Sequence, residues 1–114
     1  MYKRDDIEEL LRTYNVNKAR LKLINDVLNS DQHGHELLSL QRNIDIVDSM
    51  LMMLSKEEQF IIQTHVIDGL DWPRTLVEHD NLWGSELGRS ERTLKRKQQK
   101  AIDKMLNLIN DLGI

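Results

Sequence analysis

Hydrophobic residues recur at helical spacing along most of the chain, and no stretch alternates apolar and polar residues as a half-buried strand would. With one proline and five glycines in 114 residues, this pattern predicts an all-α protein. A first helix is expected to open at Asp5-Asp6, because acidic residues favour a helix N-terminus. Asn17, on its apolar stripe, marks either a polar pairing position or a bend near residues 14–17. The stripe comprises Ile7, Leu10, Leu11, Tyr14, Leu21, Ile24 and Leu28.

A second helix is predicted from about Glu36, after a loop at 29–35 that is broken by Gly34. Its apolar residues repeat three and four positions apart, namely Leu37, Leu40, Ile44, Val47, Leu51 and Leu54. About two and a half heptads suit an antiparallel hairpin with the first helix, which we favour, or a dimer seam. Residues 1–53 are thus expected to form an N-terminal helical arm for packing or dimerisation. We interpret Met50, Met52 and Met53 as packing residues; if exposed, they would form an adaptable partner surface.

The second half of the chain carries a series of helix start and stop signals. Ser55-Lys56-Glu57-Glu58 has the sequence of a capping box, which begins a helix. The other signals are Gly69 as a C-terminal glycine, Asp71 with Pro73 at a helix start, and Ser90 at the start of the last helix. They predict helices at about 56–68, 72–80 and 91–111, with a connector at 81–89. Residues 54–114 are expected to form a second, helical domain.

Charge is distributed unevenly along the chain. The formal net charge is only -3, so the total gives no argument for nucleic-acid binding. Residues 89–104, however, hold seven Lys or Arg and two acidic residues, whereas residues 1–88 hold nine basic and sixteen acidic residues. A concentrated basic segment on an acidic chain gives a polarised surface field. We expect the acidic arm to face away from any DNA.

The last predicted helix has two different faces. Arg92, Lys95, Arg96 and Gln99 follow the spacing i, i+3, i+4, i+7 and form a basic, polar face. The opposite side carries Leu94, Ala101, Ile102, Met105, Leu108, Ile109 and Leu112. A helix that enters the major groove needs this arrangement, because one face must reach base edges while the other is anchored on the domain. Lys97 and Lys100 flank the basic face and suit phosphate contacts.

The run at 54–72, LSKEEQFIIQTHVIDGLDW, resembles the opening of region 4 of sigma-70-type factors. Leu87-Gly88-Arg89-Ser90 and the run at 90–102, SERTLKRKQQKAI, resemble its turn and recognition helix. The chain is similar to small phage regulators of the ArpU/RinA type, which use this fold to activate late genes. The resemblance covers about residues 54–106 and implies a sigma-region-4-like helix-turn-helix domain.

The resemblance also implies roles for individual residues. Arg92, Lys95 and Arg96 would read bases, Thr93 would contact the DNA backbone, and Trp72 would close the short helix onto the core. The chain departs from the family pattern at Arg74-Thr75-Leu76-Val77, where the family usually has Glu-Ile-Ala, and in its longer connector. These departures affect the angle between the two helices of the motif.

The sequence therefore predicts a sequence-specific regulator of transcription that binds double-stranded DNA, is phage- or prophage-encoded, and has neither enzymatic activity nor a cofactor. Expected partners are duplex DNA, RNA polymerase and a second copy of the chain. The base-reading set is Arg92, Lys95, Arg96 and Gln99, and the phosphate-contacting set is Arg74, Arg89, Ser90, Thr93, Lys97 and Lys100. Two alternatives remain open: a DNA-packaging protein resembling a small terminase, and a sigma-like module that binds polymerase or a host factor.

Other chemistry finds little support in the sequence. The chain has no cysteine, which excludes disulfides and Cys-based zinc sites, and His33-Gly34-His35 lacks a third ligand. No apolar run approaches the length of a membrane span or signal peptide, so a cytoplasmic protein is expected. We interpret His65 and His79 as surface or boundary residues, and Glu57-Glu58 as parts of the capping box. Trp83 either fills a hollow beside the connector or contacts a partner.

Overall fold

The computed structural model describes residues 1–27, 30–84 and 88–113, and these residues contain helices and no strand. The α-helices are α1 (Arg4–Arg12), α2 (Tyr14–Asp26), α3 (Gly34–Met52), α4 (Lys56–Ile61), α5 (Trp72–Trp83) and α6 (Glu91–Asp111). A short 3-10 helix, η1 (Ser30–His33), precedes α3, and a π-helix, η2 (Ile62–Ile67), continues α4. The predicted all-α class is confirmed. Leu28, Asn29 and Leu87, to which the sequence assigned roles, lie outside the described residues.

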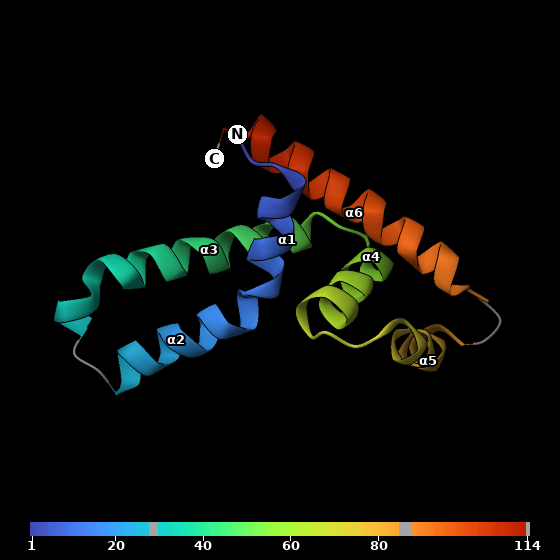
Figure 1. The fold of residues 1–114 in the computed structure, drawn as a ribbon, viewed down its shortest axis with the longest axis horizontal. Helices are drawn as coiled ribbons and strands as arrows, with labels where there is room; N and C mark the ends of the chain where they lie inside the picture. The colour runs from blue at the N-terminus through green and yellow to red at the C-terminus, as the bar shows by residue number, and fades with distance from the viewer. Residues whose placement is uncertain (28–29, 85–87, 114) are drawn as a thin grey trace.

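The N-terminal segment forms two helices, and the break between them lies next to 14–17, where the sequence offered a bend as one of two interpretations. α1 ends at Thr13, whose hydroxyl donates a hydrogen bond to the Glu9 carbonyl at 2.7 Å. A side chain that bonds to its own backbone in this way competes with helix continuation. α2 then runs antiparallel to α3 as a hairpin, while α1 crosses toward α6 (Figure 1). Gly34, predicted as a loop break, is instead the first residue of α3.

The predicted apolar stripe of α3 is used for packing within the chain. Leu40, Ile44, Val47 and Leu54 are buried, and Leu37 and Leu51 are half-buried. Met50 is buried as expected. The interpretation of Met52 and Met53 as packing residues is wrong, because α3 ends there and both side chains are exposed, at 79% and 66%.

One hydrophobic core joins the two predicted segments. Ile7 and Leu11 of α1 belong to the same buried cluster as Ile102 and Met105 of α6. The segments are also joined at the chain ends. The Tyr2 backbone exchanges two hydrogen bonds with the Asn110 side chain, at 2.9 and 3.0 Å. The predicted division between residues 53 and 54 therefore falls within a shared core.

Local capping signals shape the C-terminal half as predicted. Ser55 Oγ accepts from the Glu58 N–H at 3.2 Å, and Glu58 Oε1 accepts from the Ser55 N–H at 3.0 Å. Asp71 accepts from the Arg74 N–H at 2.9 Å at the start of α5, and Gly69 has a φ of +75°. α5 continues to Trp83, past the expected end at 80–81, so the connector begins three residues later than predicted.

The helix that begins at Ser55 widens halfway along its length. Its second part, η2, has π-type hydrogen bonding, and the Asp68 N–H bonds to the Gln63 carbonyl five residues earlier, at 2.9 Å. Within this wide turn the His65 ring stacks on Trp72, with 3.7 Å between ring centroids. His65 Nδ1 also bonds to the Leu70 carbonyl at 2.7 Å. η2 is thus joined to the start of α5, and Trp72 closes this corner.

Candidate nucleic-acid interface

α6 is the helix that the sequence singled out, and it is anchored along one side. Ser90 caps it by accepting a hydrogen bond from the Thr93 N–H at 3.2 Å. Leu94, Ala101, Ile102, Met105 and Ile109 are buried, and Leu108 is half-buried. Leu112 was placed on the buried side but is 65% exposed, because it follows the end of α6. The buried side therefore fixes α6 on the molecule over most of its length.

The four predicted base-reading residues are all exposed on α6. Arg92 and Arg96 make no ion pair with any residue that the structure describes. Lys95 Nζ lies 3.0 Å from Glu91 Oε1, one turn earlier on the same helix. Because exposed pairs of this kind contribute little free energy, Lys95 can exchange its partner readily.

Gln99 differs from the other three because it is engaged by the N-terminal helix. The Arg4 guanidinium hydrogen-bonds to the Gln99 side chain and lies 2.6 Å from Asp103 Oδ1. α1 therefore reaches the exposed face of α6, and only the α2–α3 hairpin lies at the far end of the molecule from the start of α6 (Figure 1). The arm was expected to face away from DNA, and Arg4 is the part of it that reaches the helix proposed to contact DNA.

The predicted phosphate-contacting residues fall into two groups. Arg74 and Lys100 are exposed, and the hydroxyls of Ser90 and Thr93 lie 3.0 Å apart at the start of α6. In contrast, Arg89 and Lys97 point toward Glu57 of α4. The positive charges of Arg89 and Lys97 are therefore partly neutralised by Glu57.

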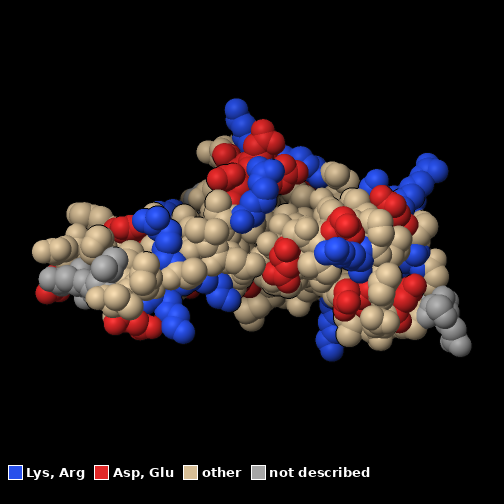
Figure 2. Space-filling view, turned by 60° about the horizontal axis from the view of Figure 1, so that its bottom comes forward, with Lys and Arg blue, Asp and Glu red and all other residues tan. Residues whose placement is uncertain are grey.

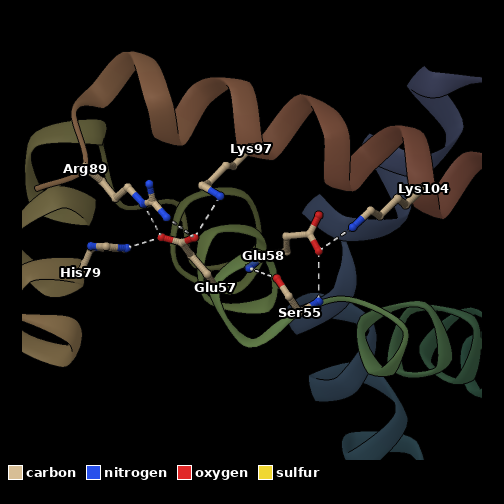
Figure 3. Close-up of polar contacts among 7 residues, drawn as sticks. All are labelled: Ser55, Glu57, Glu58, His79, Arg89, Lys97 and Lys104. Carbon is tan, nitrogen blue, oxygen red and sulfur yellow. Dashed lines mark hydrogen bonds and ion pairs between the residues drawn. The ribbon is translucent and has the colours of Figure 1, made fainter. Parts of the chain in front are cut away.

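Glu57 is the centre of this second group (Figure 3). Its Oε2 lies 2.7 Å from His79 Nε2 and 3.1 Å from Arg89 Nε, while its Oε1 lies 3.1 Å from Lys97 Nζ. Burial raises the pKa of this carboxyl, but hydrogen bonds from His79, Lys97 and Arg89 outweigh burial and bring the pKa to about 2. One carboxylate thus links α4, α5, α6 and the segment before α6.

His79 is fully buried, so its interpretation as a surface or boundary residue is wrong. Its ring lies 5.8 Å from the Phe60 ring and 4.7 Å from the Trp83 ring, and Trp83 remains about one third exposed. The missed signal was the spacing of Trp72, Leu76, His79 and Trp83, which places His79 on the inner face of α5. Glu58 is part of the capping box as interpreted, but Glu57 is not, because its carboxylate contacts His79, Arg89 and Lys97 instead.

A basic groove lies between the start of α4 and the outer turns of α6. Its volume is about 440 Å³, and it is lined by Arg89, Arg96, Lys97, Lys100 and Lys104 together with Ser55, Glu58 and Thr93. Lys104 Nζ bonds to Glu58 Oε1 at 2.9 Å. The pKa of Glu58 is lowered, since this contact and the bonds from Ser55 outweigh burial, which raises it. Of the five cations, Lys104 pairs with Glu58 in the groove, and Arg89 and Lys97 pair with Glu57 beside it.

The face turned forward in Figure 2 has a different character. On it, Lys and Arg side chains lie beside Asp and Glu side chains, with uncharged surface between the clusters. That face therefore offers no continuous basic surface. The excess of cations described above belongs to α6 and the residue that precedes its cap.

Within the described ranges, no helix combines the length and apolar character needed to cross a membrane. Nor do those residues place three or more His, Cys, Asp or Glu side chains where they could hold a metal ion. The fold and the surface define the chain as an all-helical protein with a cationic C-terminal helix. No protein-family model matches the chain, and neither a curated protein nor a solved structure is found to match it.

Proposed function

We propose that this chain binds duplex DNA in a sequence-specific manner through the first turns of α6 and regulates transcription. The observation that carries the proposal is the state of Arg92, Arg96 and Lys100. All three are exposed on α6, and none makes an ion pair with a described residue. A row of free cations on a firmly anchored helix suits a surface that carries a negative charge at every phosphate.

The position of α6 in the molecule supports the same proposal. Its N-terminal end projects at one extremity of the molecule, where the α2–α3 hairpin does not reach (Figure 1). A major groove about 12 Å wide admits a single helix, so the first turns of α6 can enter it. α5 is seen nearly end-on in Figure 1 while α6 crosses the view, so the two helices are steeply inclined to each other, as a helix-turn-helix requires.

The contacts suggest a division of roles. Arg92, Lys95 and Arg96 would reach base edges, and Arg74 and Lys100 would contact phosphates. Gln99 is bonded to Arg4, so we assign it to base reading only if that contact opens on binding. The regulatory role rests on the resemblance of residues 54–106 to region 4 of sigma-70-type factors.

Lys95→Ala and Arg96→Ala are each expected to weaken binding to a specific duplex by about 1–3 kcal/mol while the helical content stays unchanged. The duplex would first be selected from a random pool, and binding measured by fluorescence anisotropy. Lys22→Ala, an exposed position on α2, removes one charge at the other end of the molecule and serves as the matched control. Equal affinity of the parent and a Lys95→Ala/Arg96→Ala double variant would exclude this face.

Binding is also expected to weaken steeply with salt. If α6 and its neighbours neutralise about three to five phosphates, the logarithm of the binding constant falls with a slope of about -3 to -4.5 against the logarithm of salt concentration. Titrations between low and physiological salt would measure this slope. A flat response, with a protein recovered as partner, would contradict the proposal and favour the protein-interaction module. A stable ring oligomer would favour the packaging protein.

A further inference from the structure

A second surface, separate from the basic face of α6, lies between α3 and the C-terminal end of α6. It is a groove of about 580 Å³ whose floor includes Ile46, Met50 and Ile109. Leu38 and Leu112 line it and are 73% and 65% exposed. Apolar residues exposed singly are normal on a protein surface, whereas here they gather along one groove, so this surface is a candidate for an interaction. The groove lies on a different face of α3 from the buried stripe of Leu40, Ile44 and Val47.

We propose that a second copy of this chain docks in this groove, with the two α3 helices antiparallel across a two-fold axis. The α3 residues that line the groove are Leu38, Gln41, Arg42, Asp45, Ile46 and Ser49. With the axis between Asn43 and Ile44, each of them faces another member of the same set. Arg42 then lies opposite Asp45 of the second copy, and Gln41 lies opposite its Ile46. A two-fold interface requires this self-complementarity.

Charge identifies a second copy as the occupant. Arg42 is exposed beside the groove and makes no ion pair with the part of the chain that the structure describes. Asp45 accepts a hydrogen bond from Gln41 at 2.9 Å but has no cationic partner there either. The two-fold arrangement supplies both missing partners at once, because Arg42 and Asp45 occur in both copies. Two such pairs fix the register of the helices and select this partner.

The apolar part of the groove fits the same geometry. α3 has 19 residues and is therefore about 28 Å long. The two α3 helices can contact each other along this length and form a seam. The C-terminal turns of both α6 helices flank this seam with Leu108 and Leu112, giving a cluster of four helices. The N-terminal halves of α6 point away from the seam (Figure 1), so the inference does not depend on the proposed DNA contact.

Charge reversal tests the register directly. Arg42→Asp and Asp45→Arg each create two like-charged contacts per dimer, so each is expected to raise the dimer dissociation constant at least about tenfold. The double variant Arg42→Asp/Asp45→Arg should regain the parent value. A mixture of the two single variants should form a heterodimer, because both contacts then join opposite charges. Sedimentation equilibrium of the full chain over a range of concentrations measures all four cases.

Matched variants separate docking from folding. Leu112→Glu is expected to weaken the dimer, whereas Val16→Glu, at a position 59% exposed on α2, should leave it unchanged. Circular dichroism should show the same helical content for every variant. A parent chain that stays monomeric at all concentrations would overturn the inference. The inference would also be overturned if both charge reversals left the dimer dissociation constant unchanged, or if the two single variants failed to associate in a mixture. DNA binding can persist in each of these cases, so failure here is distinguishable from failure of the proposed function.

Discussion

Ile7→Ala is expected to lower the free energy of unfolding of the whole chain by about 2–5 kcal/mol, the usual cost of such a truncation in a packed core. The Ile7 side chain is fully buried and belongs to the cluster that includes Ile102, Met105 and Ile109 of α6. Removing three of its carbons leaves a cavity between α1 and the helices around it. Because that cavity lies in the shared core, the loss should affect both halves of the chain.

The measurement uses the positions of the tryptophans. Trp72 and Trp83 are the two tryptophans of the chain and both lie in α5, so their fluorescence during urea unfolding reports the C-terminal half. Ile7→Ala should shift this transition as much as it shifts the circular-dichroism transition. Val16→Ala, at an exposed position on α2, should change stability by less than about 0.5 kcal/mol. A fluorescence transition unmoved by Ile7→Ala would instead favour two independent units, 1–53 and 54–114.

Local signals in the sequence predicted the helix boundaries of the C-terminal half well. A cap depends on residues three positions apart, as in the bonds between Ser55 and Glu58 or between Ser90 and Thr93. Such contacts form in almost any tertiary setting, so they can be inferred without knowing the fold. The buried side of α6 was found for a related reason, since helical periodicity fixes which residues share a face.

Features that depend on tertiary contacts were missed. The sequence offered a bend at 14–17 as one interpretation, next to the break at Thr13, but nothing local marks the π-type turns of η2. His79 is buried because Phe60 and Trp83 surround it and Glu57 receives its hydrogen bond. Helical spacing places His79 on the inner face of α5, but it does not reveal the carboxylate that compensates its burial, because Glu57 comes from another helix.

The sequence predicted which residues belong to the candidate site but not which partners they contact within the molecule. The sequence identified the cations of α6, and the structure leaves Arg92 and Arg96 exposed as expected. It could not show that Arg89 bonds to Glu57, 32 positions away, or that Gln99 bonds to Arg4, 95 positions away. These long-range contacts decide which polar side chains are free, so they change the proposed roles although the basic segment itself was found.

Glu57→Gln is expected to lower the free energy of unfolding by about 3 kcal/mol at neutral pH. The carboxyl of Glu57 has an ordinary pKa of 4.5 and a folded-state pKa of about 2, and each unit of difference corresponds to about 1.4 kcal/mol. Its side chain is only 16% exposed, so solvent screens these contacts weakly. Gln keeps the shape of the side chain but loses the charge that faces His79, Arg89 and Lys97.

The sign of the pH dependence makes this prediction specific. A carboxyl whose pKa is depressed by folding stabilises the protein above its unfolded pKa, and this contribution is lost as pH falls through the folded pKa. The gap in stability between the parent and Glu57→Gln should therefore be full above pH 5 and should close between pH 4.5 and 2. Urea unfolding across this range measures the gap, with Glu78→Gln, exposed on α5, as control. A gap that stays constant with pH would mean that the charge of Glu57 does not hold α4, α5 and α6 together, and that the orientation of α6 depends on apolar packing alone.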